Sequence, residues 1–156
     1  MKLVIEKADK KDLDELLELS DRLLRQMMEI DKEIKLIKNH GPLKRKYYLT
    51  ELKNPNSVFF KAVCDGKTVG FVFGTLKEGI PILKDDDYGN LNEIYLLPEF
   101  RRKGIGHRLM KSMRQWFKKK GVKWMRLYAL VKNKRAQTAY KKFGFMEFRK
   151  IMRMKV

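Results

Sequence analysis

Leucine and methionine recur every three or four positions in the first third of the chain, which is the period of an α-helix. The stripe consists of Leu13, Leu16, Leu17, Leu23, Leu24, Met27 and Met28. Asp9 or Asp12 is suited to cap the N-terminus of this helix, and Leu3 to Ile5 predicts a strand before it. The sequence Asn-His-Gly-Pro at 39–42 predicts a break, so a second helix is expected from Lys44 to Lys53.

The middle of the chain has the pattern of antiparallel strands. Apolar and β-branched residues dominate Ser57 to Cys64 and Thr68 to Leu76, and the Asp-Gly-Lys sequence at 65–67 is typical of a hairpin turn. A polar stretch follows at 77–87, and Tyr88 to Leu97 predicts another strand.

The helical period returns between Gly104 and Lys120. Its apolar stripe is Ile105, Leu109, Met113, Trp116 and Phe117. We then expect a strand at 122–131, a helix at 134–142 and a final strand or tight hairpin at 145–155. The predicted order is β-α-α-β-β-β-α-β-α-β, a mixed α/β (α+β) fold with a mostly antiparallel sheet flanked by helices. At 156 residues this is most simply a single domain over 1–156.

Arg101 to Gly106, with the sequence Arg-Arg-Lys-Gly-Ile-Gly, joins the strand at 88–97 to the helix at 104–120. Free N–H groups and the helix dipole make a helix N-terminus an anion site. Glycine lets the main chain approach an anion closely, and three basic side chains add positive potential. The segment therefore predicts a pyrophosphate site.

Two common pyrophosphate motifs do not fit this turn. A Rossmann fingerprint needs a third glycine where Leu109 stands, and a phosphate-binding loop of the NTPase type needs Gly-Lys-Ser/Thr. Arg-x-x-Gly-x-Gly at 101–106, preceded by Leu-Leu-Pro-Glu-Phe at 96–100, resembles the acetyl-CoA loop of the GCN5-related N-acetyltransferase (GNAT) family. A second motif of that family is matched by Asn133, Ala136, Tyr140, Lys142 and the Phe-Gly-Phe sequence at 143–145.

The resemblance implies a GNAT fold that moves an acetyl group from acetyl-CoA to a primary amine by direct attack in a ternary complex. The amine would belong to a protein lysine, a protein N-terminus or a small molecule. It also implies a bulge near 94–96 that opens a slot for pantetheine, with the Leu96 N–H as the oxyanion donor. The implied cofactor-binding residues are Ile94, Leu96, Arg101, Arg102, Lys103, Gly104, Ile105, Gly106, His107 and Asn133.

Two residues are candidates for proton transfer. Glu93 stands where many family members place a catalytic glutamate, and burial in an apolar strand makes a carboxylate a stronger base, acting directly or through water. The alternative is a solvent-side glutamate that shares one strand face with Leu91 and Tyr95. Tyr140 matches the tyrosine that protonates the departing thiolate, although it can also be a packing residue. Asn133 is either a pantetheine ligand, a helix cap or both.

The positive charge is unevenly distributed. Residues 1–98 contain 17 Lys and Arg against 17 Asp and Glu, whereas residues 99–156 contain 20 against 2, so the net charge of +18 lies in the last part of the chain. CoA needs only a few cations. The remaining positive charge has four explanations: binding to nucleic acid, binding to an acidic protein surface, a solvated face, or a thermophile-like composition. The alternative function is therefore a GNAT-like nucleic-acid-binding module that uses the basic C-terminal third.

Several classes of site are not expected. The single cysteine, Cys64, lies in an apolar strand pattern, excludes an internal disulfide and suits a reducing, cytoplasmic compartment. His40 and His107 are too few for a typical metal cluster with it, so no metal is expected. The sequence contains no run of eighteen apolar residues, so no membrane span is expected. The start at 1–7 is too short and too charged for a signal peptide.

Acceptor choice is expected to depend on three segments. These are the loops at 36–44 and 77–87 and the segment after Phe145, where eleven residues follow. Many family members have a longer hairpin there that forms one wall of the acceptor site. Here that wall is expected to be short, to come from a partner chain in a homodimer, or to be missing.

Overall fold

The computed structural model describes the whole chain, Met1 to Val156. Five strands form one sheet in the order β1-β2-β3-β4-β5, in which only the β4–β5 pair is parallel. The strands are β1 (Leu3–Lys7), β2 (Ser57–Cys64), β3 (Lys67–Lys77), β4 (Tyr88–Leu96) and β5 (Trp124–Leu127). The helices are α1 (Leu13–Ile30), α2 (His40–Lys53), α3 (Ile105–Lys119) and α4 (Lys134–Phe143), with short 3-10 turns at Lys10–Asp12 and Pro98–Phe100. The predicted mixed α/β fold is confirmed.

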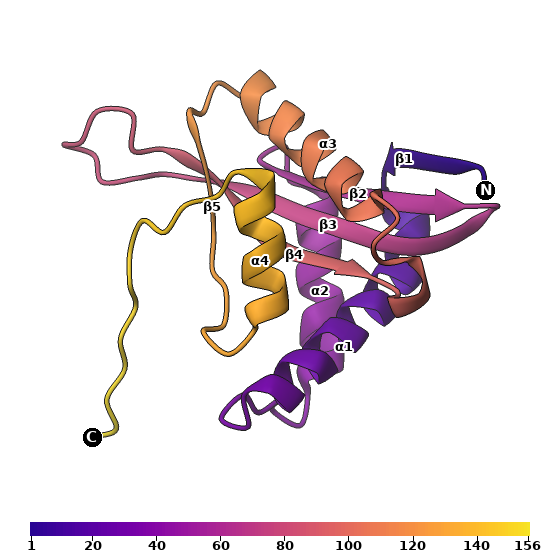
Figure 1. The fold of residues 1–156 in the computed structure, drawn as a ribbon, viewed down its shortest axis with the longest axis horizontal. Coiled ribbons are helices and arrows are strands. Elements are labelled where there is room, and N and C mark those ends of the chain that lie inside the picture. The colour runs from indigo at the N-terminus through magenta and orange to yellow at the C-terminus, as the bar shows by residue number, and fades with distance from the viewer.

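The sheet is the middle of three layers. In Figure 1, α3 and α4 lie in front of the sheet, and α1 and α2 lie behind it. On the rear face, Tyr48 of α2 packs against Phe59 and Phe73, whose rings stack at 4.0 Å. On the front face, a Cβ at Gly74 would meet the Met113 sulfur at 2.6 Å. Glycine therefore lets α3 lie directly on the sheet backbone.

Local chemistry explains most element boundaries. Asp9 accepts a hydrogen bond from the Lys11 amide and forms a capping box with Asp12, so the predicted aspartate cap belongs to the 3-10 turn that precedes α1 and not to α1 itself. The predicted hairpin turn is present, with Asp65 and Gly66 both at positive φ.

The single cysteine, Cys64, is buried and free. No helix is long and apolar enough to cross a membrane.

Three predicted boundaries were wrong. Helix α2 begins at His40 instead of Lys44. Pro42 is tolerated in the first turn, because the N–H groups of that turn have no partner within the helix and the missing N–H of proline costs nothing there. Strand β5 has four residues instead of the ten predicted at 122–131. Residues 145–155 form no strand, because their backbone pairs with no other strand of the sheet. Figure 1 shows this last segment running away from α4 in extended form.

A charged cluster is buried between β1, β2 and the turn before α1. The Lys61 ammonium lies 2.6 Å from an Asp12 oxygen and 3.2 Å from a Glu6 oxygen. Burial alone would raise the pKa of the Asp12 carboxyl, but Lys61, the Asp9 amide and Lys11 together hold that pKa below its ordinary value. Burial opposes the charge of Lys61 as well, yet Asp12 and Glu6 raise its pKa. Asp12 and Lys61 are therefore both ionised at neutral pH.

Candidate functional site

The turn before α3 presents a row of free backbone amides. Arg102 and Gly104 have positive φ values of 59° and 75°, and the first helical hydrogen bond runs from the Arg108 amide to the Gly104 carbonyl at 3.1 Å. No amide of residues 102–107 donates to another group of the protein. Because these N–H groups lie at the positive end of the α3 dipole, the turn has the geometry that can hold an anion.

Gly106 adds independent support for this anion site. A Cβ at this position would meet nothing within 4 Å, and its φ is not positive. The packing and backbone of the protein therefore do not require glycine, which is a poor helix former. The absence of a side chain leaves the amides accessible to a ligand that approaches the first turn.

The basic side chains of the turn have different roles. Arg101 points inward: its Nε donates to the Leu96 carbonyl at 2.9 Å and its guanidinium donates to Gln26 at 3.1 Å. It braces the turn against β4 and α1. Arg102 and Lys103 are exposed and remain available to an anion.

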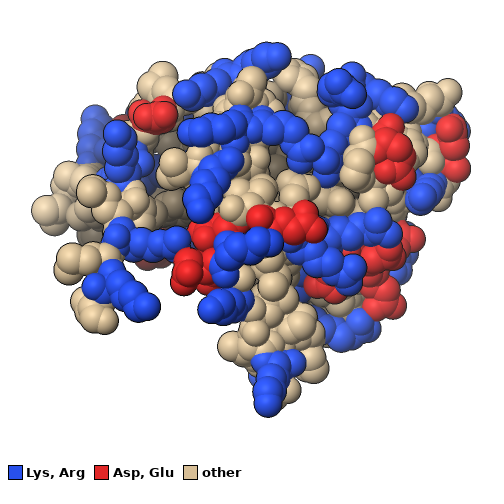
Figure 2. Space-filling view, turned by 60° about the horizontal axis from the view of Figure 1, so that its bottom comes forward, with Lys and Arg blue, Asp and Glu red and all other residues tan.

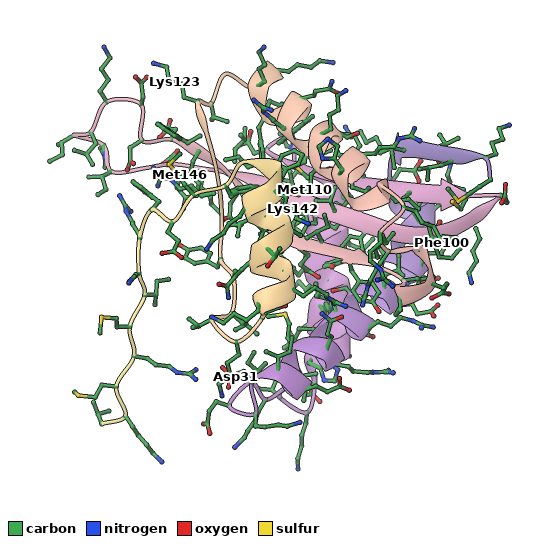
Figure 3. The ribbon with its side chains drawn as sticks, viewed as in Figure 1. Asp31, Phe100, Met110, Lys123, Lys142 and Met146 are labelled. Carbon is green, nitrogen blue, oxygen red and sulfur yellow. The ribbon has the colours of Figure 1, made fainter.

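Two further predicted site residues of the turn differ in their exposure, since Ile105 is buried and His107 is exposed. Ile105 is fully buried in the core, so only its amide can face a ligand. The His107 ring packs edge-on against Phe143 at 5.1 Å. Figure 3 shows Phe100 at the start of this turn, where the chain leaves the sheet.

β4 contains a bulge, although not where the sequence predicted it. Glu93 pairs with Phe73 and Leu91 with Gly74, so Asn92 is the extra residue and the expected position at 94–96 was wrong. The extra residue also reverses the alternation. Leu91 therefore faces α3 while Glu93 faces α1 and α2, and the expectation that they share a strand face is corrected.

β4 and β5 separate beyond the bulge. Their last pair is Leu91 with Leu127, whereas β4 continues to Leu96. The Leu97 amide donates to Val69 of β3, so by alternation the N–H groups of Ile94 and Leu96 point to the opposite edge. This edge has no strand neighbour, and it can pair with an extended ligand.

Glu93 is held by two hydroxyl groups that the sequence analysis did not identify. Tyr48 donates to one carboxylate oxygen at 2.9 Å, and Ser20 donates to the other. Ser20 had a detectable signal, because it is a polar residue within the apolar stripe of α1. Tyr48 had none, because α2 has no clear apolar stripe.

Tyr140 and Asn133 come from α4 and the turn before it, on the face opposite Glu93. Burial raises the pKa of the Tyr140 phenol, which keeps it protonated at neutral pH. Its ring contacts Phe145 at 5.9 Å, and its hydroxyl makes no hydrogen bond within the protein. Asn133 accepts a hydrogen bond from the Ala136 amide at 3.1 Å, so it is a helix cap whose amide NH₂ remains free.

Much of the excess positive charge lies on α3 and α4. Their exposed basic residues include Arg108, Lys111, Arg114, Lys118, Lys134, Arg135, Lys141 and Lys142. These helices share the sheet face on which the turn at 101–106 begins, so the field favours the approach of an anion. On the face drawn in Figure 2, Lys and Arg are widespread and acidic groups gather near the centre and at the right.

Comparison with known proteins gives a consistent family. A sequence profile described as the Acetyltransferase (GNAT) family matches residues 4–145. An uncharacterized N-acetyltransferase from Methanocaldococcus jannaschii is 32% identical over 143 residues, which are 92% of this chain and 60% of the relative. An N-alpha-acetyltransferase from Sulfurisphaera tokodaii is 31% identical over 131 residues, 78% of this chain and 77% of the relative. The chain thus spans about 60% of the length of the first relative.

A solved structure confirms the fold. The structure of a predicted acetyltransferase with acetyl-CoA from Clostridium acetobutylicum superposes with a TM-score of 0.80 over 99% of this chain and 96% of that chain. Only 20% of the residues are identical, so this similarity concerns the fold alone.

Proposed function

The chain belongs to the GNAT family of acetyltransferases, and we propose that it transfers an acetyl group from acetyl-CoA to a primary amine in a ternary complex. One observation carries the proposal: the unpaired amides of residues 102–107 lie next to the free edge of β4. The amides would hold the pyrophosphate, and the Ile94 N–H would pair with the pantetheine arm.

The reaction removes two protons from the acceptor nitrogen and delivers one to the departing thiolate. Glu93 takes a proton from the ammonium of the acceptor, directly or through water, because only a neutral amine has a lone pair for attack. The nitrogen then bonds to the thioester carbon while the Leu96 N–H stabilises the developing oxyanion. Glu93 releases this first proton to solvent and takes the second proton of the nitrogen as the C–S bond breaks, while Tyr140 gives its own proton to the departing thiolate. Solvent then returns a proton to Tyr140.

The acceptor is proposed to be a protein N-terminus. The support is the Sulfurisphaera tokodaii relative, which is named an N-alpha-acetyltransferase. A screen of free CoA release tests this, using peptides with a free N-terminus, N-blocked peptides containing lysine, polyamines and aminoglycosides. Turnover that requires the free N-terminus is expected. Turnover with another amine alone would move the assignment to that acceptor class, and no CoA release with any of them would contradict the activity.

Replacing Gly106 with alanine should weaken acetyl-CoA binding about ten- to a hundred-fold. The new methyl group would stand between the amides and the pyrophosphate, and each hydrogen bond to a charged group contributes about 1.5–3 kcal/mol. Calorimetric titration measures the effect. Gly41→Ala is the matched control, since Gly41 also lies in a first helical turn with nothing within 4 Å of its Cβ position. Equal affinity of both variants for acetyl-CoA would mean that the pyrophosphate does not bind at this turn.

Replacing Tyr140 with phenylalanine should lower kcat about ten-fold without changing KM for acetyl-CoA. The effect is modest for a general acid because a thiol pKa of about 8–9 makes the thiolate a tolerable leaving group. Steady-state kinetics separate the two parameters. Tyr47→Phe, on an exposed tyrosine of α2, is the control and should match the wild type. A rise in KM equal to the fall in kcat would assign Tyr140 to packing.

A homodimer is the macromolecular partner that we propose. Large apolar side chains are exposed along β5 and after α4, including Trp124, Tyr128, Met146, Phe148, Met152 and Met154. Figure 3 shows Met146 beyond the end of α4, where the extended segment begins. A second copy would bury these side chains. Light scattering that gave only the 18.6 kDa monomer at micromolar concentration would contradict the dimer.

A further inference from the structure

The carboxylate of Glu93 accepts hydrogen bonds from residues of two different helices. We propose that Tyr48 and Ser20 are positioning residues, which hold this carboxylate in the single orientation needed to take a proton from the acceptor. The inference rests on the proposed function, because it assigns a task to a residue of that same site. Neither residue has an assigned role in the reaction scheme above.

The geometry of these two hydrogen bonds leaves the carboxylate able to accept a proton. Tyr48 from α2 donates to Oε1 at 2.9 Å, and Ser20 from α1 donates to Oε2. Each carboxylate oxygen has two lone-pair directions, so one remains on each oxygen. Two donors on separate oxygens also stop rotation of the carboxylate about its last bond. The remaining lone pairs therefore point in fixed directions.

Both donors are themselves immobile. The side chains of Ser20 and Tyr48 are completely buried, with 0% of their surface exposed, so water cannot replace either hydroxyl. The Tyr48 ring packs between Phe59 at 5.1 Å and Phe73 at 5.9 Å. Burial and the negative charge of Glu93 strongly raise the pKa of Tyr48, so it remains a hydrogen-bond donor throughout the physiological range.

The fold alone does not require this arrangement. Ser20 interrupts the apolar stripe of α1, and burying hydroxyls around a carboxylate is costly compared with apolar packing. The two hydrogen bonds to Glu93 also depend on the bulge at Asn92, which turns Glu93 away from α3 and toward these two hydroxyls. A backbone irregularity and two buried polar groups from different helices thus converge on one carboxylate.

A double-mutant cycle separates positioning from packing. Tyr48→Phe and Ser20→Ala should each lower kcat at least about ten-fold, with KM for acetyl-CoA unchanged within about two-fold, and neither should lower kcat further in a Glu93→Gln background. Tyr47→Phe is the matched control, since Tyr47 is the neighbouring tyrosine, is 42% exposed and makes no hydrogen bond to Glu93. It should not change kcat in either background.

The outcomes discriminate between the claims. Equal losses from Tyr48→Phe in both backgrounds would show a purely structural role and overturn the inference. A wild-type rate for Glu93→Gln would overturn both the inference and the base assignment, while leaving acetyl transfer intact. Crystal structures of the Ser20→Ala/Tyr48→Phe variant give a test independent of turnover. Several Glu93 rotamers would support the inference, and one unchanged rotamer would overturn it.

Discussion

Glu93→Gln should lower kcat about 10²- to 10⁴-fold, which is the range for loss of a general base. Glutamine has nearly the same shape but cannot accept a proton at neutral pH, so the acceptor amine would remain protonated. Affinity for acetyl-CoA should stay within about two-fold, because Glu93 faces α1 and α2 rather than the amides before α3. Single-turnover kinetics and calorimetry measure the two quantities separately.

Glu51→Gln is the matched control for this variant. Glu51 also accepts a hydrogen bond from a serine hydroxyl, that of Ser57, but it lies near the C-terminal end of α2, away from the β4–β5 opening. Its replacement should leave kcat unchanged. If Glu93→Gln retained more than half of the wild-type rate across the pH range, the proton would have to leave by another route.

Lys61→Met should lower the free energy of unfolding by about 3–5 kcal/mol, the usual cost of leaving one partner of a buried ion pair uncompensated. Lys61 and Asp12 expose only 10% and 6% of their side chains, and methionine fills the same space without a charge. For a domain of this size the melting temperature should fall by roughly 10 °C. Urea unfolding at neutral pH measures the change.

The pH dependence of this deficit has a defined sign. The pKa of Asp12 is lowered in the folded protein, so its stabilising contribution is present above the ordinary carboxyl pKa of 3.8 and is lost as the pH falls through the lowered value. The difference between the wild type and Lys61→Met should therefore shrink below about pH 4. A difference that stayed constant into acid would mean that lost packing, not charge, causes the effect.

Lys11→Met provides the control for Lys61. It removes the same charge from a pair that is open to solvent, because the Lys11 and Asp9 side chains are 78% and 62% exposed at a separation of 3.6 Å. Surface pairs contribute little, so stability should change by no more than about 0.5 kcal/mol. A larger loss would point to the capping turn at Asp9 instead of the buried cluster.

The sequence predicted the elements whose causes are local. The apolar stripe of α1, the Asp-Gly hairpin turn and the glycines before α3 depend on neighbours a few residues away, so each leaves a readable pattern. The turn at 101–106 is such a case, since glycine conformation and a helix N-terminus are enough to create free amides. The same reasoning failed for 145–155, whose backbone pairs with no strand of the sheet.

The sequence alone therefore predicted the mixed α/β fold, the glycine-containing turn before α3 and the place of Glu93 in β4. The direction in which Glu93 points depends on one extra residue, Asn92, in the register between β3 and β4. Its partners Ser20 and Tyr48 lie 73 and 45 positions away along the chain. A register shift and contacts over such separations arise from packing the whole sheet against α1 and α2, and no local pattern encodes them.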